Sequence, residues 1–173
     1  KKKIVYRCKM DSYINAISTA VPPFRYRRSE IMEFMIRAHG LNSEEVERLI
    51  ALYRATGIKT RYSVIEDYSR KPEQFSFYPR SENLEPFPTT SQRMEAYKKN
   101  ALPLAVAAIE GLSRLGVDTH QVTHLIVVSC TGMYAPGLDI GIIEFLSLPS
   151  HIHRTAINFM GCYAAFNGLK VAD

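Results

Sequence analysis

The first sixty residues show apolar and polar positions in two different periods. Residues 13–21 are mainly apolar and end at two prolines, which predicts a β-strand. Residues 29–39 have helical spacing and stop before a glycine. Asn42 is the expected N-cap of a second helix, because Glu45 stands three residues later as in a capping box. Apolar residues then recur at helical spacing until Gly57, so we expect two helices after one strand.

A long segment without a clear period follows, over residues 66–90. It is rich in proline, serine and aromatic residues. A structureless connection of this length is uncommon in a compact domain, so the segment predicts short irregular helices or a functional excursion.

From residue 91 onward, helical and strand-like patterns alternate. The longest helix opens at Ser91, and Pro103 within it predicts a kink or a restart because proline removes one helix hydrogen bond. The run 124–130 has apolar residues on both faces, which predicts a strand buried on both sides. A short helix, a strand and a last helix are expected at 139–146, 154–159 and 163–172. This order is typical of an α/β fold with a parallel sheet flanked by helices.

Composition places the chain among ordinary globular proteins. It has 173 residues, of which 46% are hydrophobic, enough for one domain with a core. The sequence shows no apolar run of about 20 residues and no signal-peptide pattern. Three widely spaced cysteines do not form a disulfide framework, so we expect a reduced, cytoplasmic setting and no membrane association. CxxC and HExxH patterns are missing, which argues against a zinc site.

Basic residues exceed acidic ones, with a net charge of +5 and a pI near 9.1. Part of the excess is the N-terminal lysine triplet, and another part is the cluster Arg25-Tyr26-Arg27-Arg28. No nucleic-acid-binding module accompanies these residues, so we expect no nucleic-acid partner. A small polyanionic substrate such as a phosphorylated carrier and a merely solvated surface both explain the charge.

Cys162 is the strongest candidate for chemistry, because it follows a predicted strand and a glycine and opens a predicted helix. The first turn of a helix has free N–H groups and the positive end of the helix dipole, which favour a nucleophilic thiolate. The alternative is a buried structural cysteine. A partner base is not evident: His151 and His153 precede the strand and should lie at its far end.

Cys130 ends the other apolar strand. Ligands of open α/β sheets collect outside the carboxyl ends of the strands, so Cys130-Thr131 and Cys162 should face one crevice. The alternative is that Cys130 is simply a buried residue at the end of a strand.

Two motifs resemble the type III polyketide synthases, the chalcone/stilbene synthase family of the thiolase-like superfamily. They are Val128-Ser129-Cys130-Thr131-Gly132-Met133-Tyr134-Ala135-Pro136-Gly137 and Asn158-Phe159-Met160-Gly161-Cys162-Tyr163-Ala164-Ala165. Thr56-Gly57-Ile58 with Arg61 also fits, although initiating β-ketoacyl-carrier-protein synthases share it. The resemblance runs from residue 13 to the end of the chain.

The resemblance implies a layered αβαβα fold made of two similar halves, of which residues 1–173 match the first; the C-terminal half is expected to be missing. It also implies a homodimer and a reaction. The cysteine takes an acyl group from an acyl-CoA, and decarboxylated malonyl-CoA then extends it to a polyketide. The substrates are CoA thioesters, no further cofactor or metal is implied, and a His and an Asn of the second half assist. The chain alone is therefore expected to be inactive.

The resemblance assigns expected roles to individual residues. Cys162 matches the nucleophile, and Cys130 and Thr131 match positions that line the acyl cavity. Ala135 stands where plant members place a Met that reaches across the dimer. Arg48 matches one position that contacts the CoA phosphates; Arg54 is a candidate substitute for others that are alanines in this chain.

Two other readings stay open at this point. An initiating β-ketoacyl synthase of fatty-acid synthesis shares the fold and the nucleophile but accepts its extender from a carrier protein. A non-catalytic thiolase-like half that only binds or scaffolds would need no reactive thiol.

Overall fold

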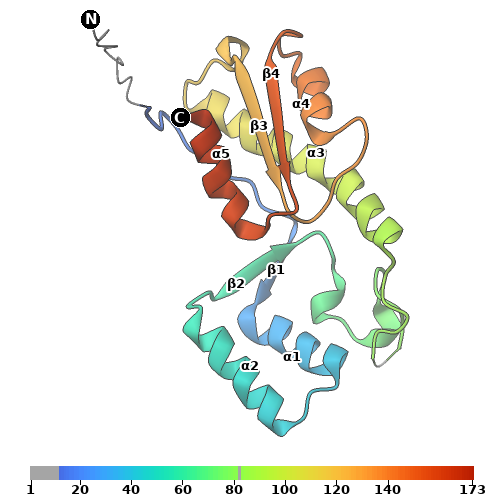
Figure 1. The fold of residues 1–173 in the computed structure, drawn as a ribbon. Coiled ribbons are helices and arrows are strands. Elements are labelled where there is room, and N and C mark those ends of the chain that lie inside the picture. The colour runs from blue at the N-terminus through green and yellow to red at the C-terminus, as the bar shows by residue number, and fades with distance from the viewer. Residues whose placement is uncertain (1–11, 82) are drawn as a thin grey trace, which may run out of the picture.

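The computed structural model describes residues 12–81 and 83–173, and these form two lobes (Figure 1). The first lobe, residues 24–88, contains β1 (Phe24–Arg27), α1 (Arg28–His39), α2 (Ser43–Ala55) and β2 (Thr60–Ser63). The second lobe, residues 89–173, contains α3 (Thr90–Arg114), β3 (His124–Ser129), α4 (Leu138–Leu146), β4 (His153–Asn158) and α5 (Ala164–Ala172). No helix in the described ranges has the length and apolarity needed to cross a membrane.

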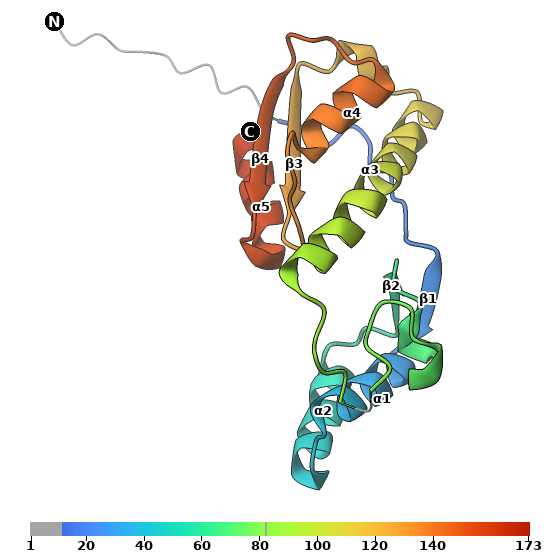
Figure 2. The same ribbon diagram turned by 90° about the vertical axis from the view of Figure 1, so that its right-hand side faces the viewer.

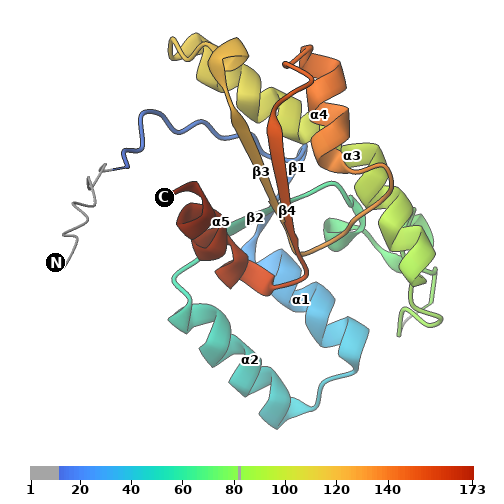
Figure 3. The same ribbon diagram turned by 45° about the horizontal axis from the view of Figure 1, so that its top comes forward.

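The second lobe is a three-layer arrangement around two parallel strands. β3 and β4 pair in register from His124 opposite His153 to Ser129 opposite Asn158. Helix α5 covers one face of the pair, and α3 and α4 cover the other (Figures 2 and 3). The core between the layers is built around the buried side chain of Ile142. The predicted α/β order from residue 91 onward is confirmed.

β3 is less buried than predicted. Both of its faces are covered by helices, yet Val128 remains 39% exposed. A two-stranded sheet has open edges, so helices on its faces do not enclose every side chain.

The first lobe has an aromatic core of its own. β1 and β2 form a short antiparallel pair, with Arg27 opposite Thr60. Alternation along β1 sends Tyr26 inward, where it is 3% exposed and packs edge-on against the ring of Tyr68. Phe34 of α1 packs against the same ring, with the two centroids 4.8 Å apart. The two lobes therefore have separate hydrophobic cores.

The capping signals predict the helix boundaries well. The side chain of Asn42 accepts a hydrogen bond from the backbone N–H of Glu45 at 3.1 Å, as the capping box requires. Helix α3 begins at Thr90, one residue earlier than predicted, because Thr89 is the cap. It runs unbroken through Pro103, so the predicted restart is wrong. Pro103 lies on the exposed face of the helix, and its ring removes a single hydrogen bond of the helix.

The strand predicted at residues 13–21 is also wrong. The segment has no strand assignment and runs past α3, with Ser18 so close to Gly111 that a Cβ at Gly111 would collide with its hydroxyl. An apolar pattern without a pairing strand beside it gives only an extended segment. The region 66–90 contains the 3₁₀ turns Asp67–Ser69 and Pro72–Gln74, as the prediction of short irregular helices requires.

Candidate active site

A sharp turn between β4 and α5 presents Cys162. Phe159 and Gly161 both have left-handed backbone conformations, with φ of 57° and 66°. Cys162 lies in the 3₁₀ turn Gly161–Tyr163, which continues directly into α5. Its thiol is free and its side chain exposed. The thiol thus stands at the start of a helix, as the sequence predicts.

The turn is joined to the end of the neighbouring strand. The backbone N–H of Phe159 donates to the carbonyl of Ser129 at 3.0 Å, one step beyond the β3–β4 ladder. The hydroxyl of Ser129 in turn donates to the carbonyl of Gly132 at 3.1 Å. Both connections that leave the carboxyl edge of the sheet, one with Cys130 and one with Cys162, are therefore fixed to the same residue.

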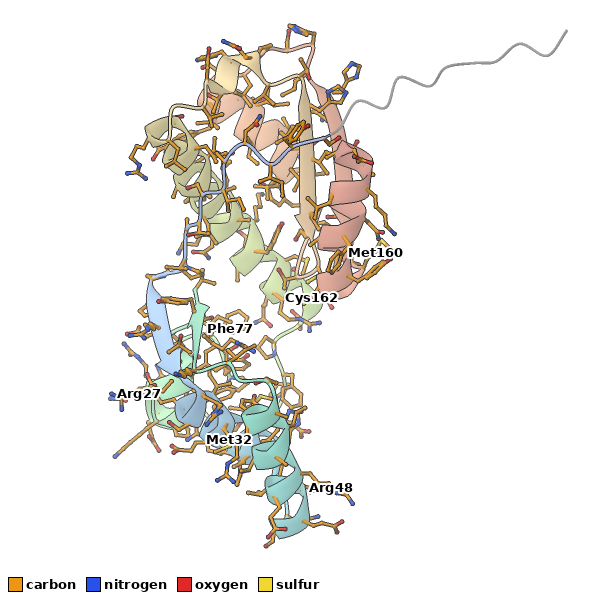
Figure 4. All side chains as sticks on the ribbon, turned by 90° about the vertical axis from the view of Figure 1, so that its left-hand side faces the viewer. Arg27, Met32, Arg48, Phe77, Met160 and Cys162 are labelled. Atoms are coloured by element: carbon orange, nitrogen blue, oxygen red, sulfur yellow. The ribbon has the colours of Figure 1, made fainter. Side chains whose placement is uncertain are left out.

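Close packing of α5 on the sheet positions the cysteine. Ala164, two residues after Cys162, is 0% exposed. Gly168 lies against β3, and a Cβ at this position would come within 2.9 Å of a methyl group of Val128. Figure 4 shows Cys162 at the end of the second lobe that faces the first lobe.

The histidines lie elsewhere in the fold. His124 and His153 begin β3 and β4, where their rings stack at 4.7 Å. Six-residue strands separate that edge from Cys162 by roughly 20 Å. His120 and His151 precede these strands, and His39 ends α1 in the first lobe. None of the histidines is at the carboxyl edge of the sheet, in agreement with the expected placement of His151 and His153.

Thr131 borders an apolar cavity of about 640 Å³ between the two lobes. Alanines of α3, including Ala101 and Ala105, form one wall, and Phe77 of the first lobe lies opposite. Cys130, Cys162 and Ala135 are not among the lining residues; Cys130 and Ala135 are exposed. The structure thus brings Cys130 and Cys162 to the carboxyl edge of the β3–β4 sheet, whereas Thr131 borders the apolar cavity, which neither cysteine lines.

Arg48 and Arg54 do not share a surface. Six residues along a helix correspond to about 120° around its axis, so the two side chains leave α2 on different sides. Arg48 pairs with Glu44 one turn earlier and is exposed. Arg54 instead lines a basic cavity with residues of β1 and α1.

Phe159 is the feature of the site that the sequence did not reveal. Non-glycine residues with positive φ are uncommon, and they concentrate where the surrounding structure fixes a functional turn. A phenylalanine before Met160-Gly161 gives no local signal for such a conformation.

Known proteins resemble the chain over nearly its whole length. Residues 2–173 match the family model of chalcone and stilbene synthases, N-terminal domain. The alpha-pyrone synthesis polyketide synthase-like Pks18 of Mycobacterium tuberculosis is 32% identical over 133 residues, covering 76% of this chain and 32% of that protein. PKS-I of the brown alga Ectocarpus siliculosus superposes with a TM-score of 0.73 at 28% identity, covering 90% of this chain and 41% of that one. CsyB complexed with CoA-SH gives 0.64 at 25% identity, with coverages of 90% and 39%.

The chain spans about a third to two fifths of the length of these relatives. Its α/β architecture is that of the N-terminal domain of the thiolase-like fold, which the matched type III polyketide synthase structures share. The chain belongs to the chalcone and stilbene synthase family, the type III polyketide synthases.

Proposed function

We propose that Cys162 is the acyl-carrying nucleophile of a type III polyketide synthase. Its thiolate attacks the carbonyl of a starter acyl-CoA, the acyl–cysteine thioester forms, and CoA leaves as the thiol. Malonyl-CoA then loses CO₂, and the resulting enolate attacks the acyl–cysteine carbonyl. The new carbon–carbon bond releases the Cys162 thiolate, and repeated cycles lengthen the polyketide.

One observation carries the proposal: an exposed, free thiol at a helix start on the carboxyl edge of a parallel strand pair. The positive end of the helix dipole and the free N–H groups of a first turn stabilise negative charge on sulfur. Membership of the family supports the same assignment. The structure of CsyB with CoA-SH supports CoA thioesters as substrates.

Cys162 also needs a base and oxyanion donors. Its histidines are at the far edge of the sheet or in the first lobe, so they are not placed to serve Cys162. We propose that the family's His and Asn supply the base and the oxyanion donors. We also propose a homodimer, in which Ala135 gives a smaller cross-subunit contact than a Met, and a cytoplasmic enzyme without a further cofactor.

Acyl loading tests the nucleophile. The full-length protein is incubated with an acyl-CoA, and intact-protein mass spectrometry measures the adduct. We expect one acyl group, released by hydroxylamine, in the wild type and in Cys130→Ala, and none in Cys162→Ala. Cys130→Ala is the matched control, because both thiols are free and exposed. An adduct that persists in Cys162→Ala would sink the assignment, and no adduct at all would favour a non-catalytic half.

The extender substrate separates the polyketide synthase from an initiating β-ketoacyl synthase. The loaded protein is given either malonyl-CoA or a malonyl carrier protein, and products are identified by mass. We expect repeated extension with malonyl-CoA. Strict dependence on the carrier protein with a single extension would show the β-ketoacyl synthase instead.

A further inference from the structure

The first lobe contains a basic cavity that lies apart from Cys162. It has a volume of about 860 Å³ and is lined only by residues between 25 and 60. The basic side chains come from separate elements: β1, the start of α1, the end of α2 and the connection before β2. They are Arg25, Arg27, Arg28, Arg54 and Lys59.

These cations have little internal compensation. In the described ranges the ion pairs are Arg48–Glu44, Arg70–Glu66 and Arg154–Asp139, and none involves the cavity. The one acidic residue in the lining is Glu30, whose carboxylate accepts the backbone N–H of Arg27 at 2.6 Å. Like charges held together without partners repel one another, so an anion in the cavity would relieve this repulsion.

Part of the cluster is fixed in position. Arg28 donates from its guanidinium to the carbonyl of Tyr53 at 3.2 Å, which ties the side chain to the last turn of α2. Its backbone N–H donates to the carbonyl of Lys59 at 2.9 Å. Arg25 and Arg27 lie two residues apart on β1 and so share its exposed face. The start of α1 adds the positive end of a helix dipole.

We propose that this cavity binds the di- or triphosphate group of a small organic metabolite. Each guanidinium group can donate two parallel hydrogen bonds to the oxygens of one phosphate. Several arginines together therefore suit a ligand with more than one phosphate. The volume lies in the range of small-molecule sites, about 300–1,000 Å³. Met32 and Ile50 provide an apolar wall for the organic part.

The site is separate from the proposed acyl-transfer site. No residue of the second lobe lines it, and Cys162 is in that lobe. Figure 4 shows Arg27 and Arg48 pointing to different sides of the first lobe, with Met32 between them. Binding measured on Cys162→Ala therefore tests this site whether or not the acyl-transfer proposal holds.

Calorimetric titration of the full-length protein with inorganic pyrophosphate tests the proposal. We expect salt-sensitive binding that weakens by about tenfold or more in the double variant Arg25→Gln/Arg27→Gln. Arg114→Gln is the matched control, because this arginine is also exposed but ends α3 in the second lobe. Lys59→Gln is a second test variant. Lys59 lies outside helices and strands, so a loss of binding in this variant cannot be attributed to misfolding of β1.

Unchanged binding in both test variants would overturn the proposal, as would an equal loss in Arg114→Gln. Loss only in Arg48→Gln would place the anion on the other side of α2 and also overturn it. Competition then identifies the source of the diphosphate. Displacement of pyrophosphate by ADP but not by CoA supports a nucleotide ligand, whereas displacement by CoA would make the cavity part of the substrate site and overturn the proposal of a separate one.

Discussion

The backbone N–H of Phe159 donates to the carbonyl of Ser129 at 3.0 Å, and this bond joins the two connections at the carboxyl edge of the sheet. Phe159 has a left-handed backbone, so the chain turns sharply once the bond is made. The turn delivers Cys162 to the surface three residues later. The position of the thiol is thus set by this backbone turn together with the packing of α5 on β3.

Cys162 is expected to react with iodoacetamide faster than Cys130 near neutral pH. Both thiols are exposed, but only Cys162 stands at a helix start, where the free N–H groups stabilise the thiolate. Timed labelling of the full-length protein followed by peptide mass spectrometry measures both rates. Equal rates would contradict the electrostatic argument.

Gly168→Val is expected to destabilise the second lobe by about 1–3 kcal/mol, because overpacking forces α5 away from β3. The first atom of the new side chain already comes within 2.9 Å of Val128. Ala165→Val on the exposed face of α5 introduces the same side chain type without this contact. Thermal unfolding of both variants gives the comparison. A similar loss of stability in Gly168→Val and Ala165→Val would show that the low helix propensity of valine, and not the contact with Val128, causes the effect.

Asp67→Asn is expected to cost about 2–4 kcal/mol at neutral pH. Asp67 is fully buried, and its carboxylate accepts bonds from the amides of Ser76, Phe77 and Tyr78 and from the Ser76 hydroxyl. Burial by itself raises the pKa of Asp67, but these hydrogen bonds outweigh it and the pKa lies below 3.8.

The sign of the pH effect follows from this lowered pKa. The charged carboxylate contributes stability above about pH 4, and the contribution is lost as the pH falls through the folded-state pKa. Denaturant unfolding between pH 7 and pH 3 should show an acid-dependent loss in the wild type that is smaller in Asp67→Asn. Glu73→Gln, an exposed acid in the next 3₁₀ turn, is the control. Parallel pH curves for Asp67→Asn and the wild type would refute the assignment.

Alkaline unfolding is expected to depend on Tyr26. Burial, with smaller contributions from the charges of Glu66 and Asp67, raises the pKa of Tyr26 to about 12. The neutral phenol contributes stability below pH 10, and this is lost as the pH rises toward 12, because the unfolded chain ionises first. Tyr26→Phe should remove that loss while costing about 1 kcal/mol at pH 7 for the bond to the Ile65 carbonyl. Unfolding curves that fall equally with pH in both proteins would contradict this.

Local signals predict the helices but not the first lobe's strands. The capping box at Asn42 fixes α2 because a cap is satisfied within a few residues. β1 and β2 were missed because each has only four residues and is rich in charged or polar side chains. Their pairing brings Arg25 opposite Tyr62, across a long stretch of sequence, and no local pattern encodes such a contact.

The candidate site likewise has features that local sequence predicts and features that only the tertiary fold creates. The position of Cys162 after a strand and a glycine is visible in the sequence, since both signals are adjacent to it. The separation of Arg54 from Arg48 follows from helix geometry, but its approach to Arg28 requires the folding of β1 against β2. Convergence of distant arginines on one cavity is a tertiary property, and only the structure reveals it.

The separate cores of the two lobes have a consequence for dynamics. The aromatic core around Phe34 and the aliphatic core around Ile142 share no residue, so either can open without exposing the other. Amide hydrogen exchange should then sort the backbone into two cooperative units with different opening free energies. A ligand held by the first lobe would slow exchange in β1 and β2 and leave the protection of β3 and β4 unchanged.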